Sequence, residues 1–174
     1  MVSEPAFAVW ITGLPASGKS TIARALAHQL TARGVDSAVL ESDELRKVLT
    51  ARPTYSEEER DTFYSQITYI GMLLARHGVH VIFDATANRR KYRDSARIQF
   101  PKYFEVYVAT PLEVCMARDP KGIYRSAAKG GNVPGLQSEY EPPLNPDVLV
   151  RGDIEDADAA AQRIVAALAH KGYL

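Results

Sequence analysis

Residues 13–21 read Gly-Leu-Pro-Ala-Ser-Gly-Lys-Ser-Thr. An apolar run at residues 7–11 precedes this stretch and a helical pattern follows, which is the strand, loop and helix context of a phosphate-binding P-loop. Glycines let successive backbone N–H groups turn toward phosphate oxygens, and the N-terminus of the following helix adds a partial positive charge. The stretch therefore predicts a binding site for a nucleoside triphosphate.

The residue types within this loop have expected roles. Gly13 and Gly18 permit the bend of the backbone. Lys19 reaches the β- and γ-phosphates, where its charge supports catalysis, and Ser20 supplies a hydroxyl to Mg²⁺. The residues predicted to bind the nucleotide are Gly13, Ala16, Ser17, Gly18, Lys19, Ser20 and Thr21.

Composition narrows the class of protein. The chain has 174 residues, 46% of them hydrophobic, and no compositional break, so we expect a single domain over residues 1–174. Lysine plus arginine equals aspartate plus glutamate at 21 each, which argues against nucleic acid or an anionic membrane as a partner. Apolar stretches are too short to span a membrane and no signal-peptide pattern is present, so a cytoplasmic protein is expected.

Apolar runs and helical patterns alternate along the chain. Strands are predicted at residues 7–12, 36–41, 79–84, 103–109 and 147–150. Helices are predicted at residues 19–33, 43–50, 57–77, 89–99, 111–117 and 154–170. The alternation predicts a three-layer α/β fold, in which a parallel five-stranded sheet is covered by helices on both faces.

Residues 119–146 interrupt the alternation, because they are rich in Gly, Pro and Lys and have no sustained period. Long loops in compact domains usually serve as lids or binding loops, so we expect a lid here. In the last helix, Asp153 is expected to be the N-terminal cap and Ile154 to face the core.

The predicted helix at 57–77 carries two local signals. Ser56 and Glu59 have the spacing of a capping box at its start. One stripe of this helix is apolar and could face either the core or a second copy of the chain in a homodimer. The stripe is formed by Phe63, Ile67, Ile70 and Leu74.

Polar residues follow the second and third strands, at the edge where such sheets bind ligands. Asp43 and Arg46 are three residues apart at a helix start, where the carboxylate could accept a hydroxyl proton and the guanidinium could hold an anion. The alternative is that Asp43 only caps the helix and Arg46 is solvated. Asp84 has the position of a Walker B carboxylate that holds Mg²⁺, or else it pairs with a buried arginine. Both aspartates are catalytic candidates.

Four further segments carry specific patterns. They are Tyr55-Ser56-Glu57-Glu58-Glu59-Arg60, Thr110-Pro111-Leu112-Glu113-Val114-Cys115, Arg118-Asp119-Pro120-Lys121-Gly122-Ile123-Tyr124 and Tyr140-Glu141-Pro142-Pro143-Leu144-Asn145-Pro146. The last three resemble consecutive signatures of the adenylylsulfate kinase family, and the first resembles that family's aromatic-Ser-x-Glu-Asp-Arg segment. The similarity runs from about residue 7 to residue 150.

This resemblance implies a kinase that uses Mg²⁺ and transfers the γ-phosphoryl group of ATP to the 3′-hydroxyl of adenosine 5′-phosphosulfate. By position, it implies that Asp43 orients or deprotonates the hydroxyl and that Arg118 lies near the base of ATP. Ser20 and Asp84 would serve the metal. The residues implied to bind the acceptor nucleotide are Arg46, Tyr55, Arg60, Asn88, Lys121, Gly122 and Val133.

The chain departs from the family pattern where the acceptor would bind. Glu41-Ser42-Asp43 replaces Asp-Gly-Asp, Phe63 replaces an asparagine, and Ala87-Asn88-Arg89-Arg90 replaces Ser-Pro-Tyr-Arg. Val133 falls where a lid aromatic would stack on the adenine, so we expect a weaker or differently shaped base pocket.

Three rival functions stay open at this point. A related kinase could act on a different nucleotide with a modified 5′-phosphate, using the same lid. Asp43 and Arg46 with residues 84–88 also resemble polynucleotide 5′-hydroxyl kinases and other small-molecule P-loop kinases, but those lack this lid, and zero net charge disfavours a polyanion. A nucleotide-dependent switch is the third reading, although the sequence has no obvious switch glutamine.

Overall fold

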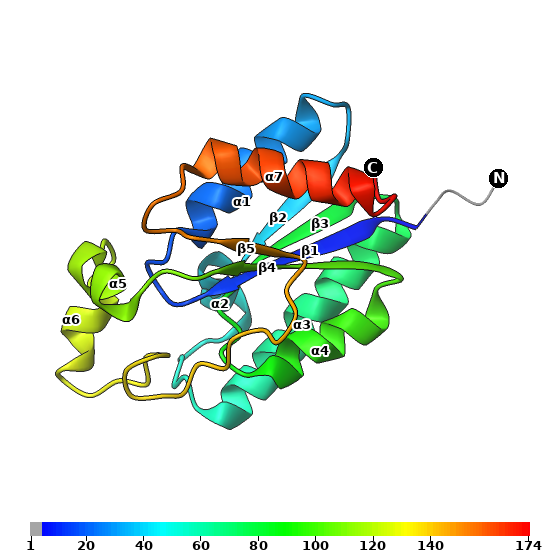
Figure 1. Cartoon of the computed structure of the whole chain (residues 1–174). Coiled ribbons are helices and arrows are strands. Elements are labelled where there is room, and N and C mark those ends of the chain that lie inside the picture. The colour runs from blue at the N-terminus through cyan, green and yellow to red at the C-terminus, as the bar shows by residue number, and fades with distance from the viewer. Residues whose placement is uncertain (1–4) are drawn as a thin grey trace.

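The computed structural model describes residues 5–174, and its centre is one parallel sheet (Figure 1). The strands lie in the order β2-β3-β1-β4-β5. Their bounds are β1 (Phe7–Gly13), β2 (Ser37–Glu41), β3 (His80–Asp84), β4 (Lys102–Val108) and β5 (Val148–Val150). The predicted α/β fold with five parallel strands is confirmed.

Helices cover both faces of this sheet. They are α1 (Lys19–Thr31), α2 (Ser42–Leu49), α3 (Glu57–Arg76), α4 (Arg90–Gln99), α5 (Leu112–Arg118), α6 (Ile123–Ala127) and α7 (Ala157–His170). In Figure 1, α1 and α7 lie on one face, α3 and α4 lie on the other, and α5 and α6 lie beyond the carboxyl ends of the strands. Within residues 5–174, no helix has both the length and the apolar character needed to cross a membrane.

The central strand β1 supplies both cores. Phe7, Val9 and Ile11 pack with α1 and α7, whereas Ala8 and Trp10 point to the opposite face and pack with α3 and α4. All seven residues of β1 are buried, as expected for a central strand of a parallel sheet. The loop that follows β1 therefore starts from a strand that is buried on both faces.

The last helix starts later than the sequence predicts. Asp156, not Asp153, is the N-cap of α7, and its carboxylate accepts hydrogen bonds from the backbone N–H groups of Asp158 and Ala159. Asp153 instead pairs with Arg151 at 2.9 Å within the preceding turn. Because this turn precedes the helix, Ile154 is 75% exposed and does not face the core, so both predictions for these residues are wrong.

The predicted irregular segment 119–146 contains one short helix, α6, which the sequence analysis missed. The Asp119 carboxylate accepts hydrogen bonds from the backbone N–H groups of Tyr124 and Arg125 at 3.1 and 3.0 Å and so fixes the first turn of α6. A helix of five residues is too short to show a period in the sequence. A local cap rather than an apolar stripe sets its position.

The apolar stripe on α3 faces the core. Phe63 and Ile67 are buried against the sheet, and Ile70 and Leu74 pack against the same cluster. These side chains therefore do not form a surface for a second copy, and a homodimer stays a prediction.

Candidate active site

One large cavity, of about 1190 Å³, opens at the carboxyl ends of the strands. Its wall consists of residues 15–21 and Arg24, residues 41–43 and Arg46, residues 53–55, Arg60 and Tyr64, Asp84 and Thr86, and residues 118–121, 123, 126–127 and 130–134 of the lid. Segments far apart in the sequence therefore meet at one site. Doubly wound sheets bind ligands at this edge.

The P-loop forms the floor of the cavity. Gly18 has φ of +106° and is the N-cap of α1, so the backbone turns into the helix in the left-handed region that glycine favours. Gly13 does not line the cavity, but no larger residue fits at its position. A Cβ atom there would come within 2.7 Å of the Val108 carbonyl oxygen and 2.8 Å of Ser17 Oγ. All the other residues predicted to bind the nucleotide phosphates line the cavity.

Lys19 is nearly buried at the base of the cavity, with 8% of its surface exposed. Its Nζ donates a hydrogen bond to the Leu14 carbonyl oxygen at 2.8 Å. Burial lowers the pKa of Lys19, while the nearby carboxylates of Asp84 and Asp43 oppose this effect. An ammonium group held in this way can stabilise phosphate charge more strongly than one in water.

Asp84 lies at the end of β3, where the sheet register places it beside Glu41 of β2 and Ile11 of β1. It is only 4% exposed, and within residues 5–174 its carboxylate makes no hydrogen bond or ion pair. The alternative of a buried ion pair with an arginine is therefore not observed. A buried carboxylate without a partner is costly unless a cation binds there.

The donors around Asp84 fit Mg²⁺. Asp84 and Ser20 both line the cavity next to the P-loop. No cluster of three or more His, Cys, Asp and Glu ligands exists among residues 5–174, so the protein does not build a complete metal cage there. Mg²⁺ is usually held by one or two carboxylates together with water and phosphate oxygens. A site with few protein ligands suits this ion.

Asp43 does not cap α2. Glu41 occupies the N-cap position, and Asp43 lies in the first turn of the helix with about half of its side chain exposed. Lys121 of the lid donates a hydrogen bond to Asp43 Oδ2 at 2.6 Å, and its Nζ lies 3.6 Å from Glu41 Oε1. The hydrogen bond with Asp43 raises the pKa of Lys121. These contacts join the lid to the segment after β2.

Arg46 is buried rather than solvated. Its guanidinium lies 3.8 Å from the centroid of the Phe63 ring and 4.9 Å from that of Tyr55, and it pairs with Glu59. Sequence reasoning treated Glu59 only as part of a capping box. The backbone N–H of Glu59 does donate to Ser56 Oγ at 3.2 Å, but the carboxylate turns away to Arg46 and to the residues before Ser56.

Arg60 connects α3 to the lid. Its Nη2 donates to the Asn132 carbonyl oxygen at 2.6 Å and its Nη1 to Ser138 Oγ at 3.2 Å, and only 5% of the residue is exposed. Burial lowers the pKa of this arginine. Both lid contacts are with neutral oxygen atoms, so the positive charge at the cavity wall has no anionic partner among the described residues.

Two residues predicted to bind the acceptor lie outside the cavity wall. Asn88 is buried, and its Nδ2 donates to the Glu139 carbonyl oxygen at 3.0 Å, while its own carbonyl oxygen accepts from the Glu141 backbone N–H at 2.7 Å. Gly122 has φ of +66° and forms the N-cap of α6. Gly122 gives the backbone its turn into α6, and Asn88 contacts the lid backbone, but the Oδ1 atom of Asn88 is buried without a hydrogen-bond partner among the described residues.

Val133 of the lid and Arg118 at the end of α5 both line the cavity. Val133 is 8% exposed and packs with Cys115, Tyr124 and Ala127 in a small apolar cluster. Arg118, at the end of α5, donates through Nη2 to the Gly152 carbonyl oxygen at 2.8 Å. An aliphatic side chain thus stands where the sequence comparison led us to expect an aromatic one.

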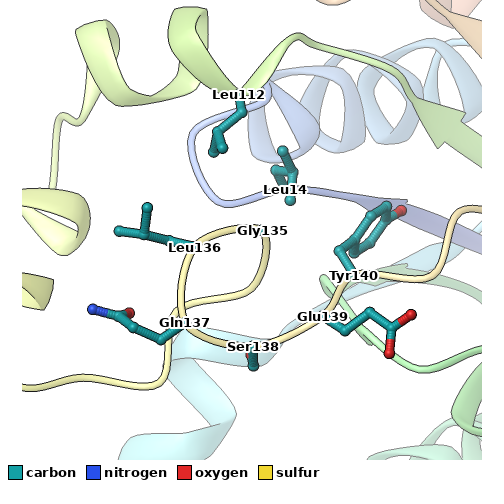
Figure 2. Close-up of a pocket in the computed structure, with 8 residues that line it drawn as sticks. All are labelled: Leu14, Leu112, Gly135, Leu136, Gln137, Ser138, Glu139 and Tyr140. Carbon is teal, nitrogen blue, oxygen red and sulfur yellow. The ribbon is translucent and has the colours of Figure 1, made fainter.

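A second pocket of about 470 Å³ is lined by Leu14 of the P-loop, Leu112 and residues 135–140 of the lid (Figure 2). Leu14 of the P-loop and Leu112 at the start of α5 lie over the lid turn that carries Gly135. A Cβ atom on Gly135 would come within 2.7 Å of Leu14, so the turn rests closely on the P-loop. None of the predicted site residues lines this pocket.

A three-layer parallel sheet, a P-loop between β1 and α1, and cationic side chains from a lid facing the same cavity define a P-loop kinase. The family model described as adenylylsulphate kinase matches residues 5–151. The chain belongs to the adenylylsulphate kinase family.

Similar proteins support this membership. The adenylyl-sulfate kinase of Gloeothece citriformis is 40% identical over 168 residues, covering 95% of this chain and 96% of the relative. The adenylyl-sulfate kinase of Microcystis aeruginosa is 39% identical, covering 95% and 93%. The APS kinase of Mycobacterium tuberculosis, solved in complex with AMPPNP and APS, superposes with a TM-score of 0.88 at 32% identity, covering 95% of this chain and 98% of that one.

Proposed function

We propose that this chain transfers the γ-phosphoryl group of ATP to the 3′-hydroxyl of adenosine 5′-phosphosulfate, giving 3′-phosphoadenosine 5′-phosphosulfate and ADP. One observation carries the assignment to particular residues. A single cavity brings the P-loop and the unpaired Asp84 carboxylate together with Arg46, Arg60 and Lys121. The similarity to a kinase solved with an ATP analogue and APS supports the choice of both substrates.

The P-loop side holds the phosphoryl donor. Backbone N–H groups of the loop bind the phosphates, and Lys19 stabilises the charge on the β- and γ-phosphates. Arg118 lies at the far end of α5, on the side assigned to the base of ATP. Bound Mg²⁺ would be held by Ser20 and Asp84 and would neutralise phosphate charge.

The opposite side holds the acceptor. Tyr55 is 45% exposed and offers a ring on which a base can stack. Arg46, Arg60 and Lys121 offer positive charge to the phosphosulfate end, which carries the anionic groups. Phe63, where the family pattern has an asparagine, changes the surroundings of Arg46. Its ring covers the Arg46 guanidinium, whereas an asparagine would offer hydrogen bonds instead.

Asp43 is the proposed general base. In the transfer step, the 3′-oxygen forms a bond to the γ-phosphorus, the bond from that phosphorus to the bridging oxygen of ADP breaks, and the hydroxyl proton passes to the Asp43 carboxylate. Asp43 suits this role better than Asp84, because its carboxylate is half exposed on the acceptor side, whereas Asp84 is buried beside the P-loop. The lid excludes water that would otherwise hydrolyse ATP.

A coupled ADP-release assay tests the function. The acceptors are adenosine 5′-phosphosulfate, adenosine 5′-phosphate and an oligonucleotide with a 5′-hydroxyl, each with ATP and Mg²⁺. We expect turnover with adenosine 5′-phosphosulfate that exceeds turnover with the other two by at least about 100-fold in kcat/KM. Equal ADP release with no acceptor present, or preference for the oligonucleotide, would overturn the proposal.

Val133 favours one second candidate, a kinase for a different nucleotide with a modified 5′-phosphate. The valine contributes no ring opposite Tyr55, so the base is stacked on one side only. Varying the base of the acceptor, and separately the group on its 5′-phosphate, in the same assay separates the two candidates. Faster turnover of such an analogue than of adenosine 5′-phosphosulfate favours the second one.

A further inference from the structure

Glu59, in the first turn of α3, lies behind the acceptor side of the cavity and contacts two parts of its wall. Its carboxylate accepts hydrogen bonds from the Tyr55 backbone N–H at 2.6 Å, from Thr54 Oγ1 at 3.0 Å and from the Thr54 backbone N–H. The same carboxylate pairs with Arg46 Nη1. Glu59 is 14% exposed at its side chain and is not itself part of the wall. Glu59 therefore contacts residues of the cavity wall but does not itself line the cavity.

The contact with Arg46 fixes one guanidinium. The rings of Phe63 and Tyr55 lie against it and restrict its plane, at 3.8 and 4.9 Å from its carbon atom to the ring centroids. Rings alone do not set the rotation of the guanidinium within that plane. Glu59 is the one carboxylate paired with Arg46 among residues 5–174, and it supplies this constraint. The remaining N–H donors of Arg46 stay free to face the cavity.

The Glu59 contacts with residues 54 and 55 stabilise an unfavourable backbone conformation. Tyr55 has φ of +56°, in the left-handed region that residues with a Cβ atom rarely adopt. Glu59 binds the N–H of this residue, and Asn132 Nδ2 of the lid donates to its carbonyl oxygen at 2.6 Å. The direction of the Tyr55 ring therefore depends on Glu59 from one side and on the lid from the other.

We infer that Glu59 is the positioning residue of the acceptor site, setting the orientation of Arg46 and Tyr55 together while leaving the ATP site unaffected. This inference rests on the proposed function, in that the acceptor is taken to lie against those two residues. A single carboxylate that orients both the cation and the aromatic ring of a pocket determines how well one acceptor fits relative to another. Disturbing it should change acceptor affinity and not donor affinity.

Glu59→Gln is the first test, because the amide oxygen still accepts backbone hydrogen bonds but has no charge to hold Arg46. We expect the acceptor KM to rise by about tenfold, with the ATP KM changed by less than about twofold. Glu58→Gln is the matched control, since it removes the same charge from the next residue of α3. Its exposed side chain makes no ion pair among the described residues, so both KM values should stay as in the wild type.

A double-mutant cycle shows whether Glu59 acts through Arg46. In an Arg46→Ala background, Glu59→Gln should change the acceptor KM by less than about twofold, because the orienting contact is already gone. A tenfold change in both backgrounds, or an equal rise in the ATP KM, would overturn the inference and leave Glu59 with a general role in folding.

An acceptor-independent readout separates this inference from the proposed function. Glu59→Ala should speed hydrogen exchange of the Thr54 and Tyr55 amides by at least about tenfold, whereas Glu58→Ala should not. No turnover of adenosine 5′-phosphosulfate by the wild-type protein would refute the proposed function but not the positioning role. Unchanged exchange at these two amides would refute the positioning role, whichever acceptor is used.

Discussion

Lys121 Nζ of the lid lies 2.6 Å from Oδ2 of Asp43, the carboxylate that follows β2. The two residues are 78 positions apart in the sequence, so the lid alone brings them together. The pair joins the proposed base to a cation on the acceptor side. We propose that an anionic group of the acceptor competes with Asp43 for Lys121 and so frees the Asp43 carboxylate to meet the hydroxyl group.

Asp43→Asn should lower kcat by about 10²–10⁴-fold, because an amide cannot accept the hydroxyl proton. ATP affinity, measured by calorimetry, should change little, since Asp43 lies on the acceptor side. Asp84→Asn should instead raise the Mg²⁺ concentration needed for half-maximal activity, because the proposed metal site loses its carboxylate. If Asp84→Asn abolished turnover at saturating Mg²⁺ while Asp43→Asn had no effect, the roles of the two carboxylates would be reversed.

Lys121→Met should raise the acceptor KM by about tenfold, because the anionic end of the acceptor loses one charge-assisted contact. Steady-state kinetics with each substrate varied in turn measures this. Lys129→Met is the control, as Lys129 lies in the same lid and has an exposed side chain. Similar kinetics for the two variants would show that Lys121 only raises the general positive charge of the lid.

Lys19→Ala should lower kcat by about 10²-fold or more, because the β- and γ-phosphates lose the cation inside the P-loop. The fold should survive, because Lys19 lies on the wall of the cavity and the Leu14 carbonyl oxygen still accepts a hydrogen bond from the Ser17 backbone N–H at 3.2 Å. Thermal unfolding checks this. Activity within about threefold of the wild type would refute the role of this loop.

Arg60→Ala should lower kcat/KM for the acceptor by roughly 10–100-fold with little change in the ATP KM. Arg60 also binds two oxygen atoms of the lid, so part of this loss comes from a less ordered lid. Arg60→Lys separates the two effects, because lysine keeps the charge and cannot reach both oxygens. An equal loss for alanine and lysine would assign Arg60 to the lid and not to the acceptor.

Stability should fall in mild acid because of His80. Its Nδ1 accepts a hydrogen bond from the Phe7 backbone N–H at 3.0 Å, and its ring stacks on Phe7. Burial, with a smaller effect of Lys102, lowers the pKa of His80 below its ordinary value of 6.5. The unfolded chain therefore binds the proton more tightly than the folded one. The contribution of His80 to the free energy of unfolding is fully present above pH 6.5 and is lost as the pH falls below that value.

Urea unfolding at several pH values measures this effect. In His80→Gln the decline between about pH 7.5 and 5.5 should be smaller than in the wild type, because glutamine does not titrate. An identical decline in both proteins would place the responsible proton elsewhere.

Most of the scaffold was predictable from sequence because its signals are local. Strand and helix patterns gave the five parallel strands and six of the seven helices, and the P-loop fixed the nucleotide site next to β1. The start of the missed helix α6 depends on the Asp119 side chain. The late start of α7 depends on Asp156, which caps the helix in place of the predicted Asp153. Spacing alone does not say which of several aspartates is the cap.

The site was predictable only in part. Residue types at the strand ends marked Lys19, Asp43 and Asp84, because parallel strands direct their carboxyl ends to one edge. The sequence could not show that Asn88 would be used to hold the lid, or that Glu59 would turn from its capping position to Arg46. Those outcomes depend on which partner is nearest once the chain has folded.

The parallel sheet, the phosphate-binding loop and the charged residues after the strands could all be predicted before folding, since each depends on neighbours within a few positions. Tertiary structure alone decided that Lys121 would meet Asp43 and that Arg46 would be enclosed by Phe63, Tyr55 and Glu59. The physical reason is that an ion pair or a stacked ring requires atoms to lie within a few ångströms. Only the packing of α3 and the lid against the carboxyl ends of the strands provides that closeness.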